Sequence, residues 1–294
     1  MKTFRYRWIL FGALLQLAAL NNQAGAQTAS IHSEVQQTYN FQPHLLTTQQ
    51  INEKSGLLDK FWEKAKSQRD VYIPGLRQEL ADFSSNPFFL FDGSQLLLSL
   101  SNTPADRKIV CAAIAHTDLH DLQSKDYFLL VHRMAAQGED TTAAAFHILA
   151  EPKFQIFIPE HSLTLAQDFC VIYMLLPTDP DFWLKPAIER LRTESDVMAQ
   201  RTLLLLLWYA QTPDADKAIQ QFSADASKPL DNKGFATELL HRKDTIDAAA
   251  RTTAAATNTE ESLRQSRRDR LKAVSDEALE DLDTLTEQII AKRN

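Results

Sequence analysis

A turn that recurs at nearly constant spacing constrains this chain more than any other feature of its sequence. Apolar segments are followed by turns at Gly138–Asp140, Pro177–Pro180 and Thr212–Asp214, some 35 to 39 residues apart. The first and third segments both close on Ala-Gln, at Ala136–Gln137 and Ala210–Gln211. A period of this length is typical of helix pairs that stack on one another. We therefore expect successive pairs to bury their apolar faces together.

The composition favours the same arrangement of helices joined by short loops. The 294 residues include only seven glycines, whereas sheet-rich folds use glycine heavily in turns and bulges. Over residues 104–242 the period and the turn chemistry resemble the HEAT family of helical repeats. The resemblance implies an all-α fold of stacked helix pairs, either an α-solenoid or a compact helical array, and it brings no catalytic residues with it.

Changes in composition divide the chain that follows residue 26 into four segments. Residues 27–47 are polar and lack sustained periodicity, which indicates a flexible leader. Helical periodicity then begins, and residues 48–242 form the predicted helical repeat domain. Residues 243–262 are rich in Ala, Thr and Asn, as in a polar linker or an exposed helix. Residues 263–294 have the pattern of a C-terminal amphipathic helix.

Several stretches carry more local predictions. Thr103 before Pro104 predicts a helix start, because the hydroxyl caps the first turn and the fixed φ of proline suits it. The aromatic stretch Pro87–Gly93 has no helical period and predicts an extended plug for the core. Thr202–Ala210 is apolar on all sides, which predicts a helix buried between neighbours. Lys153–Pro159 alternates and predicts a short strand or an irregular crossover.

The N-terminus has the three parts of a signal peptide in order. Lys2, Arg5 and Arg7 precede an apolar run over residues 8–20, and small residues follow at Ala24–Ala26. The run is shorter than the roughly 20 residues that a membrane span needs. We therefore expect residues 1–26 to be removed as a signal peptide, which leaves an exported protein, periplasmic or secreted, with no stable membrane span.

The charge of the chain bears on its partners. Cleavage after residue 26 takes the formal charge from -7 to -10, because residues 1–26 hold three basic residues and no acidic one. Duplex binding depends on basic side chains that neutralise phosphates. The sequence thus predicts no nucleic-acid partner.

Cys111 and Cys170 are the two cysteines of the chain, and each lies in an apolar helical context. An exported chain enters a compartment in which a disulfide can form. A buried cysteine is also a common small hydrophobic residue. The sequence does not show whether the two Cα atoms come within about 7 Å, so a disulfide and two buried thiols both stay open.

The candidate metal ligands are His116, Asp118 and His120. Imidazoles four residues apart share one face of a helix, and a nearby carboxylate can complete or orient a metal site. The segment lacks the glutamate of the His-Glu-x-x-His motif. It also stands at a predicted helix end, where His and Asp commonly cap the helix. We weigh metal binding against this capping interpretation and favour capping.

Other catalytic patterns are weak or missing. Glu160–Ser162 sets an acid, an imidazole and a hydroxyl side by side, but the position after Pro159 is that of a helix N-terminus, where capping explains them. The sequence contains no glycine-rich phosphate loop, no Gly-x-Ser-x-Gly motif and no Cys-x-x-Cys motif. We expect no cofactor, and a binding protein more readily than an enzyme.

The C-terminal segment combines an apolar stripe with two blocks of charge. Such a helix is not stable alone and must dock on its own domain or on a partner. The apolar stripe consists of Leu271, Val274, Ala278, Leu282, Leu285 and Ile289. The basic block is Arg264, Arg267, Arg268, Arg270 and Lys272, and the acidic block is Asp276, Glu277, Glu280, Asp281, Asp283 and Glu287.

Three functions follow as expectations from the sequence. The first is an exported, non-catalytic scaffold of the cell envelope that binds a protein or peptide on its helical repeat surface. The second is an envelope hydrolase, metal-dependent or carboxylate-based, with its site near His116 and His120. The third is a structural homo-oligomer that assembles through the C-terminal helix.

Overall fold

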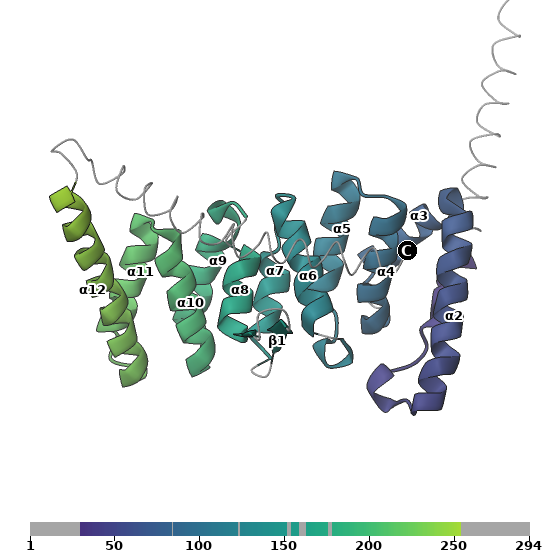
Figure 1. Cartoon of the computed structure of the whole chain (residues 1–294), viewed down its shortest axis with the longest axis horizontal. Helices are drawn as coiled ribbons and strands as arrows, with labels where there is room; N and C mark the ends of the chain where they lie inside the picture. Colours follow the sequence, from purple (N-terminus) through teal and green to yellow (C-terminus); the bar gives the residue numbers. More distant parts are fainter. Residues whose placement is uncertain are drawn as a thin grey trace, which may run out of the picture. The chain divides into compact units, whose positions relative to one another are not determined.

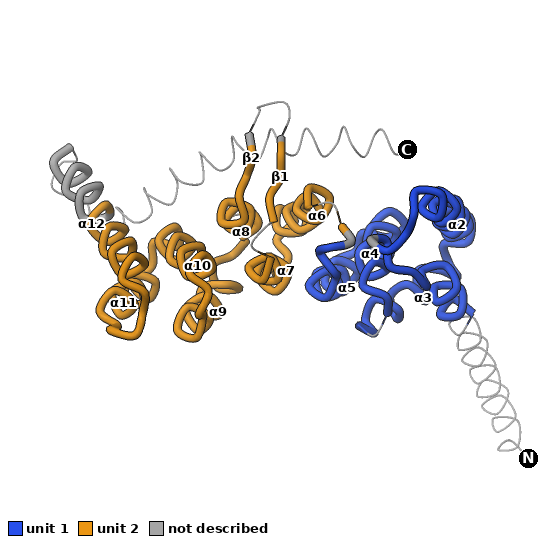
Figure 2. The backbone as a smooth tube through the Cα atoms, turned by 90° about the horizontal axis from the view of Figure 1, so that it is seen from below, with its two compact units in different colours: residues 1–121 blue, residues 122–294 orange. Residues whose placement is uncertain are grey.

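Packed helix pairs build this protein, which confirms the all-α prediction (Figure 1). The computed structural model describes residues 30–83, 85–122, 124–151, 154–158, 163–175 and 178–253. The chain divides into unit 1, residues 1–121, and unit 2, residues 122–294 (Figure 2). The single repeat domain predicted over residues 48–242 is therefore shared between two units, and the recurring turn belongs to the second.

Unit 1 is helical along its described length. A helix over residues 30–38 comes first. The elements that follow are a 3-10 turn at Pro43–Leu45, α2 (Thr48–Ser67), α3 (Arg69–Ala81), α4 (Pro87–Leu100), α5 (Pro104–Ile114) and a 3-10 turn at Leu119–Asp121.

The helix over residues 30–38 corrects the prediction of a flexible leader over residues 27–47. Ile31, Val35 and Tyr39 recur every four residues and are buried. Gly75 of α3 makes room for them, because a Cβ there would lie 2.8 Å from Ile31 Cγ2. The stripe has only three side chains among many polar ones, which is why the sequence pattern did not reveal it.

The aromatic stretch Pro87–Gly93 is the start of α4 and not an extended segment, so that prediction is wrong. Asn86 caps the helix, since its Oδ1 accepts hydrogen bonds from the backbone N–H of Phe88 (2.8 Å) and of Phe89 (3.4 Å). Gly93 leaves space for the Phe89 ring, because a Cβ there would approach the ring to 2.7 Å. Apolar residues on nearly every face of α4 conceal its helical period.

A buried carboxylate links α3 to the start of α5. Thr103 and Asp106 form the capping box that begins α5 at Pro104, as the sequence predicts. Arg77 Nε of α3 donates to Asp106 Oδ1 at 2.6 Å, and Ser101 Oγ donates to Asp106 Oδ2 at 2.7 Å. Burial alone raises the pKa of Asp106, but these donors outweigh it and hold the pKa well below its usual range.

Unit 2 holds the recurring helix pairs. Its described elements are α6 (Ser124–Ala136), α7 (Thr142–Ile148), β1 (Gln155–Ile158), β2 (Leu163–Ala166), α8 (Gln167–Leu175), α9 (Pro180–Thr193), α10 (Val197–Ala210), α11 (Pro213–Ala224) and α12 (Leu230–Thr253). Figure 2 shows α6, α8 and α10 along one side of this unit and α7, α9 and α11 along the other.

The predicted turns join the two layers of unit 2. Each leads from a helix of the α6, α8, α10 layer to the next helix of the other layer. Gly138 (φ 79°) and Gln211 (φ 51°) both adopt the left-handed conformation just beyond a helix end. Thr212 then caps α11, because its hydroxyl accepts from the Ala215 N–H at 3.2 Å. The repeated turn in the sequence is therefore a repeated helix terminator.

An antiparallel hairpin of β1 and β2 interrupts the helix pairs between α7 and α8. Its register pairs Ile156 with Leu165 and Phe157 with Thr164. Ile156 and Leu165 are buried, whereas Phe157 is 57% exposed. The hairpin contacts α6 and α8 and projects on their side of unit 2 (Figure 2). The strand predicted within Lys153–Pro159 is thus present as β1.

The last described helix, α12, continues to Thr253. Residues 243–253 are therefore helical, and the choice between a linker and an exposed helix over residues 243–262 stays a prediction. The signal peptide at residues 1–26 and the amphipathic helix at residues 263–294 lie outside the described residues. No helix among the described residues is both long enough and apolar enough to cross a membrane.

Candidate functional site

One stripe of α10 reaches the surface, which corrects the prediction that this helix is buried on every side. Met198 is 50% exposed, and Arg201, Leu205 and Tyr209 are half-buried. These positions recur at intervals of three and four and so share one side of the helix. The other sides of α10 pack against α8, α9, α11 and α12. The exposed stripe therefore lies in the strip left open between α8 and α12.

The stripe continues onto α8 through two aromatic rings. Phe169 is 47% exposed and stacks on the half-buried Tyr173, with ring centroids 6.5 Å apart. Tyr173 and Tyr209 lie on the neighbouring helices α8 and α10. Burial first, and the electrostatic effect of Tyr173 second, raise the pKa of Tyr209. A separation of 36 residues relates both Phe169 to Leu205 and Tyr173 to Tyr209. Equivalent positions of successive repeats thus present large side chains to one surface.

Contacts with α12 hold the other edge of this surface in place. Trp208 packs edge-to-face on Tyr209, with centroids 5.2 Å apart, and its Nε1 donates to the Leu239 carbonyl at 3.0 Å. Arg201 Nε donates to Asn232 Oδ1 at 2.8 Å, and its guanidinium stands 5.8 Å from the Phe235 ring centroid. These contacts hold Trp208 and Arg201 in position.

We call this surface the open face. It consists of Phe169 and Tyr173 on α8, Met198, Arg201, Leu205, Trp208 and Tyr209 on α10, and Phe235 on α12. Aromatic residues, Met and Arg are the side chains enriched at the centres of protein interfaces. Ordered rings also lose little conformational entropy on binding. The side chains of the open face are therefore of the kinds that protein interfaces favour.

The candidate metal ligands His116, Asp118 and His120 do not lie on one helix. Helix α5 ends at Ile114, so His116 and His120 do not share a helix face. His116 stacks on Phe83 with centroids 4.2 Å apart. Asp118 Oδ1 accepts from the His120 backbone N–H at 3.0 Å, a local turn contact. Among the described residues, no group of three or more His, Cys, Asp and Glu side chains could hold a metal ion.

The two cysteines are both buried, and no disulfide joins Cys111 to Cys170. Of the two alternatives that the sequence left open, the structure has the buried thiols. Burial raises the pKa of the Cys170 thiol to about 12, so this group stays protonated at neutral pH. Its Sγ donates weakly to the Leu165 carbonyl at 3.7 Å. Cys170 serves as a packed side chain in the core of unit 2.

A Ser–Glu–His cluster in unit 1 lacks the geometry for catalysis. Glu79 is buried, and its Oε1 lies 2.9 Å from His32 Nδ1. Ser85 Oγ donates to Glu79 Oε2 at 3.2 Å. Nucleophilic catalysis needs the hydroxyl on the imidazole, whereas here the carboxylate contacts both groups. The cluster fastens the helix over residues 30–38 to α3.

Several predicted positions fall outside the described residues. They are the Glu160–Ser162 triplet and the docking stripe of Leu271, Val274, Leu282, Leu285 and Ile289. The structure therefore leaves both as expectations.

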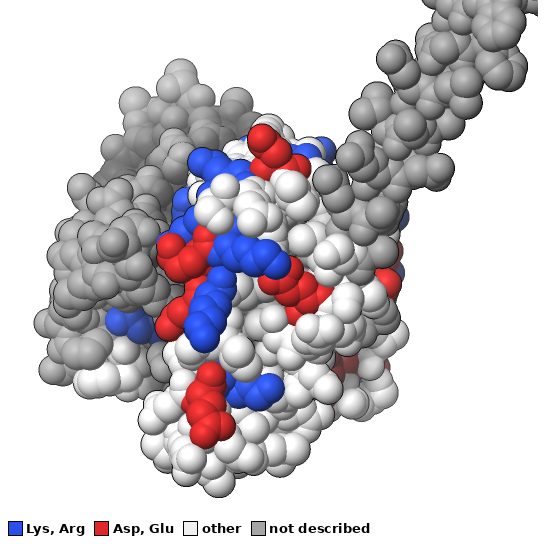
Figure 3. Space-filling view, turned by 90° about the vertical axis from the view of Figure 1, so that its right-hand side faces the viewer, with Lys and Arg blue, Asp and Glu red and all other residues white. Residues whose placement is uncertain are grey.

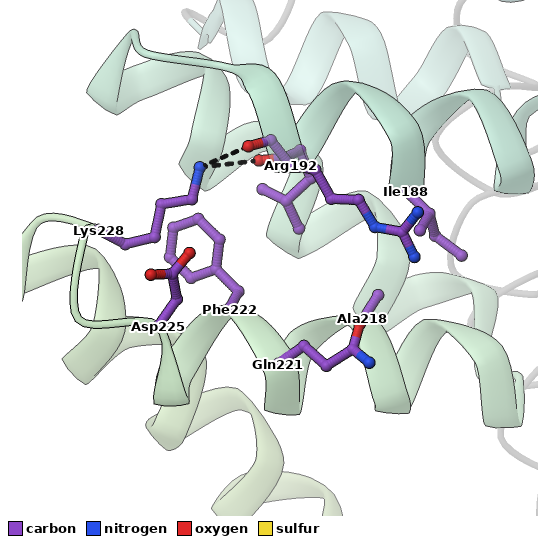
Figure 4. A pocket seen from close by; sticks show the side chains of 8 residues that line it. Ile188, Arg192, Ala218, Gln221, Phe222, Asp225 and Lys228 are labelled. Atoms are coloured by element: carbon purple, nitrogen blue, oxygen red, sulfur yellow. Dashed lines mark hydrogen bonds between the residues drawn. The ribbon is translucent and has the colours of Figure 1, made fainter.

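A hollow of about 230 Å³ lies on the other side of unit 2, between α9 and α11 (Figure 4). Lys228 Nζ donates to the Arg192 carbonyl at 2.8 Å and the Leu191 carbonyl at 3.4 Å, as drawn in Figure 4. Asp225 accepts from the Ser227 hydroxyl at 2.7 Å. Because Lys228 already binds carbonyls at the end of α9 and Asp225 already accepts within its own turn, the hollow is a weaker candidate than the open face.

Charge on the end of unit 1 that carries α2 is mixed. Figure 3 shows Lys and Arg side chains interspersed with Asp and Glu in one band, with uncharged surface around it. The sequence of α2 accounts for the mixture, since Lys60, Lys64 and Lys66 alternate with Asp59 and Glu63. This end offers no continuous basic surface of the kind that phosphate backbones bind.

Comparison with known proteins gives this chain no relatives from which a function could be transferred. No family model, no curated protein and no solved structure matches it. The resemblance to HEAT repeats therefore rests on the period and turn chemistry of the sequence and on the paired helices of unit 2.

Proposed function

We propose that this protein is an exported, non-catalytic interaction protein of the cell envelope, which binds a protein or peptide partner on the open face of unit 2. The observation that carries the proposal is the row of partly exposed aromatic side chains, Phe169, Tyr173, Tyr209 and Trp208, on two neighbouring helices. A contiguous row of exposed rings is more typical of a binding surface than single exposed rings are.

The chemistry of the open face indicates what the partner presents. The rings and Leu205 favour an apolar surface, and Arg201 favours a carboxylate. The contacts of Arg201 with Asn232 and with the Phe235 ring are both to neutral groups. We therefore expect an amphipathic partner segment with large apolar side chains and at least one acidic residue beside them.

The two other functions have less support. The metal-dependent form of the hydrolase alternative loses support because His116 and His120 do not share a helix face, and the carboxylate-based form stays a prediction. The homo-oligomer alternative depends on residues outside the described ones, so it stays a prediction. Export rests on the sequence of residues 1–26 alone.

A photo-crosslinker placed in the open face tests the proposal. Tyr173 is replaced by p-benzoylphenylalanine in the full chain, produced in cells that naturally make it, and the cells are irradiated. We expect one protein crosslinked in stoichiometric yield. The matched control carries the same group at Lys217, which is exposed on α11 in the other layer. Equal capture from both positions, or none from Tyr173, contradicts the proposal.

Paired substitutions separate binding from folding. Phe169→Ser on the open face is expected to weaken the complex about tenfold or more, as removal of a central ring does. Phe182→Ser is the control, because Phe182 is 37% exposed on α9 in the other layer. Circular dichroism and thermal unfolding should be alike for the two variants. A complex that survives Phe169→Ser as well as Phe182→Ser argues against this surface.

A further inference from the structure

We propose that, without its partner, the open face is covered by this chain's own C-terminal segment, residues 271–289, which a partner must displace. The proposal rests on the proposed function, since it concerns the regulation of the same face. Its first support is the apolar area involved: Phe169 and Met198 are each about half exposed. A contiguous surface of rings and Met in water favours association with any apolar helix that can reach it.

The C-terminal segment has the pattern that such a surface binds. Its apolar positions recur every three or four residues over residues 271–289, so a helix there would carry them on one side. The stripe is Leu271, Val274, Ala278, Leu282, Leu285 and Ile289. These residues lie outside the described ones. A helix in an apolar groove is a common mode of recognition.

Charge complementarity gives the second support. Arg201 stands within the open face, and among the described residues it forms no ion pair. Glu238 and Arg242 of α12, beside the face, already pair with each other at 2.5 Å. The C-terminal segment carries six carboxylates between Asp276 and Glu287. One of these carboxylates, placed beside the apolar stripe, would pair with Arg201. Such an ion pair orients the segment more than it strengthens binding.

The length of the chain gives the third support. Trp208 contacts the Leu239 carbonyl, so the open face lies level with that turn of α12. From Leu239 to the end of α12 at Thr253 the helix rises about 21 Å, at 1.5 Å per residue. The 17 residues over 254–270 can span up to about 56 Å when extended. The segment can therefore return to the open face on the same chain.

Attachment to the same chain makes the segment an effective competitor. A short flexible connection holds a ligand at a local concentration on the order of millimolar. A partner then binds only by out-competing the segment, and its apparent affinity falls by the fraction of time that the face is covered. Weakening the segment should therefore raise partner binding, without any change in the open face.

Crosslinking in the purified full chain tests this occupancy. The chain carries p-benzoylphenylalanine at Tyr173 and is irradiated at low concentration, with no partner present. We expect a crosslink to residues 271–289 in a product of monomer mass. The product should be lost in the Leu282→Asp, Leu285→Asp variant. The same photo-group at Lys217 on α11 is the control and should not reach the segment.

Isotope labelling decides whether the segment acts within one chain. An equal mixture of ¹⁴N and ¹⁵N chains gives unmixed crosslinks if docking is intramolecular. Crosslinks that join a ¹⁴N chain to a ¹⁵N chain would overturn the proposal in favour of the homo-oligomer. A dimer mass measured by light scattering would do the same. Absence of any crosslink to residues 271–289 would also overturn it.

The same variants separate this inference from the proposed function. Suppose that the segment is captured in purified protein but the Leu282→Asp, Leu285→Asp variant captures no partner in cells. The inference that the segment covers the open face would then stand, and the proposed function would be contradicted. Partner capture that the double substitution does not increase would show that the segment does not regulate the face. An increase of severalfold is the expected result.

Discussion

At the residue scale, Asp106 concentrates the polar contacts that hold unit 1 together. Its side chain is fully buried and accepts from Arg77, Ser101 and Thr103. The sequence predicted Thr103 and Pro104 as a helix start, and the Asp106 capping box confirms it. The contact with Arg77 was not predictable, since 29 residues separate the pair and no local pattern marks it.

We expect Asp106→Asn to destabilise unit 1 by about 2 kcal/mol, because an NH2 donor replaces one of the two accepting oxygens and the charge that pairs with Arg77 is lost. The measurement is urea unfolding followed by circular dichroism. Glu63→Gln is the control, since Glu63 is exposed and its pair with Lys66 spans 3.4 Å. Its effect should stay under about 0.5 kcal/mol. Equal losses of stability in the two variants would show that the buried contacts of Asp106 contribute no more than an exposed ion pair.

The same carboxylate makes stability depend on pH. Hydrogen bonds to the ionised form hold the folded pKa of Asp106 below its unfolded value of about 3.9. A depressed pKa gives stability that is complete above the unfolded value and is lost as the pH falls towards the folded one. The difference in stability between the native chain and Asp106→Asn should therefore shrink progressively as the pH falls from about 5 towards the folded pKa. A constant difference over that range would contradict this account.

Gly138 tests the repeated helix terminator. Its φ of 79° is unfavourable for any residue with a Cβ, and open space surrounds the position, so only backbone strain would oppose a side chain. We expect Gly138→Ala to cost about 1 kcal/mol. Gly234→Ala in α12 is the control, because its surroundings are equally open and its backbone is helical. That change should stabilise by about 1 kcal/mol, so thermal unfolding should shift in opposite directions.

At the element scale, helices were predictable where one side of the element faces water. The period of α2 began at Thr48 in the sequence and begins there in the structure. Helix α4 was missed because nearly every side is apolar, and the helix over residues 30–38 because its stripe is short. The α10 stripe was missed for a related reason: an unbroken apolar run does not show which of its sides a neighbour covers.

The helix over residues 30–38 depends on the missing side chain at Gly75. A Cβ there would lie 2.8 Å from Ile31 Cγ2 and 2.9 Å from Ile31 Cβ, so Gly75→Ala must push the helix away from α3. We expect a cost of about 1–3 kcal/mol and faster amide exchange over residues 30–38. Gly56→Ala in α2, where no atom lies within 4 Å, should leave exchange there unchanged. Unchanged exchange in Gly75→Ala as well would mean that the helix does not depend on this contact.

At the scale of the whole molecule, the sequence predicted helix pairs and their period but placed them in one domain. In unit 1 the Thr103–Pro104 start of α5 has the same capping chemistry as the Thr212–Pro213 start of α11, and the packing there also uses buried polar contacts. The open face could have been found from the 36-residue relation of Phe169 and Tyr173 to Leu205 and Tyr209. Recognising it needs the knowledge that α8 and α10 are neighbours, which periodicity alone does not supply.

We expect the two units to unfold independently. Asp106→Asn should speed amide exchange in α3 and α5 of unit 1 and leave α8 and α10 of unit 2 as protected as before. Hydrogen exchange with mass spectrometry resolves the two sets of peptides in one experiment. A loss of protection in α8 and α10 equal to that in α5 would show a single cooperative unit.

Placing Tyr173 and Tyr209 at equivalent positions of neighbouring repeats fixes a length scale for recognition. The axes of packed helices are about 8–10 Å apart. The equivalent ring of each successive repeat is therefore displaced by about that distance. Seven residues of an α-helix rise about 10.5 Å. A helical ligand that crosses these repeats would therefore be selected by side chains seven positions apart, a pattern that can be sought in candidate sequences. Leu271, Ala278 and Leu285 are spaced in this way.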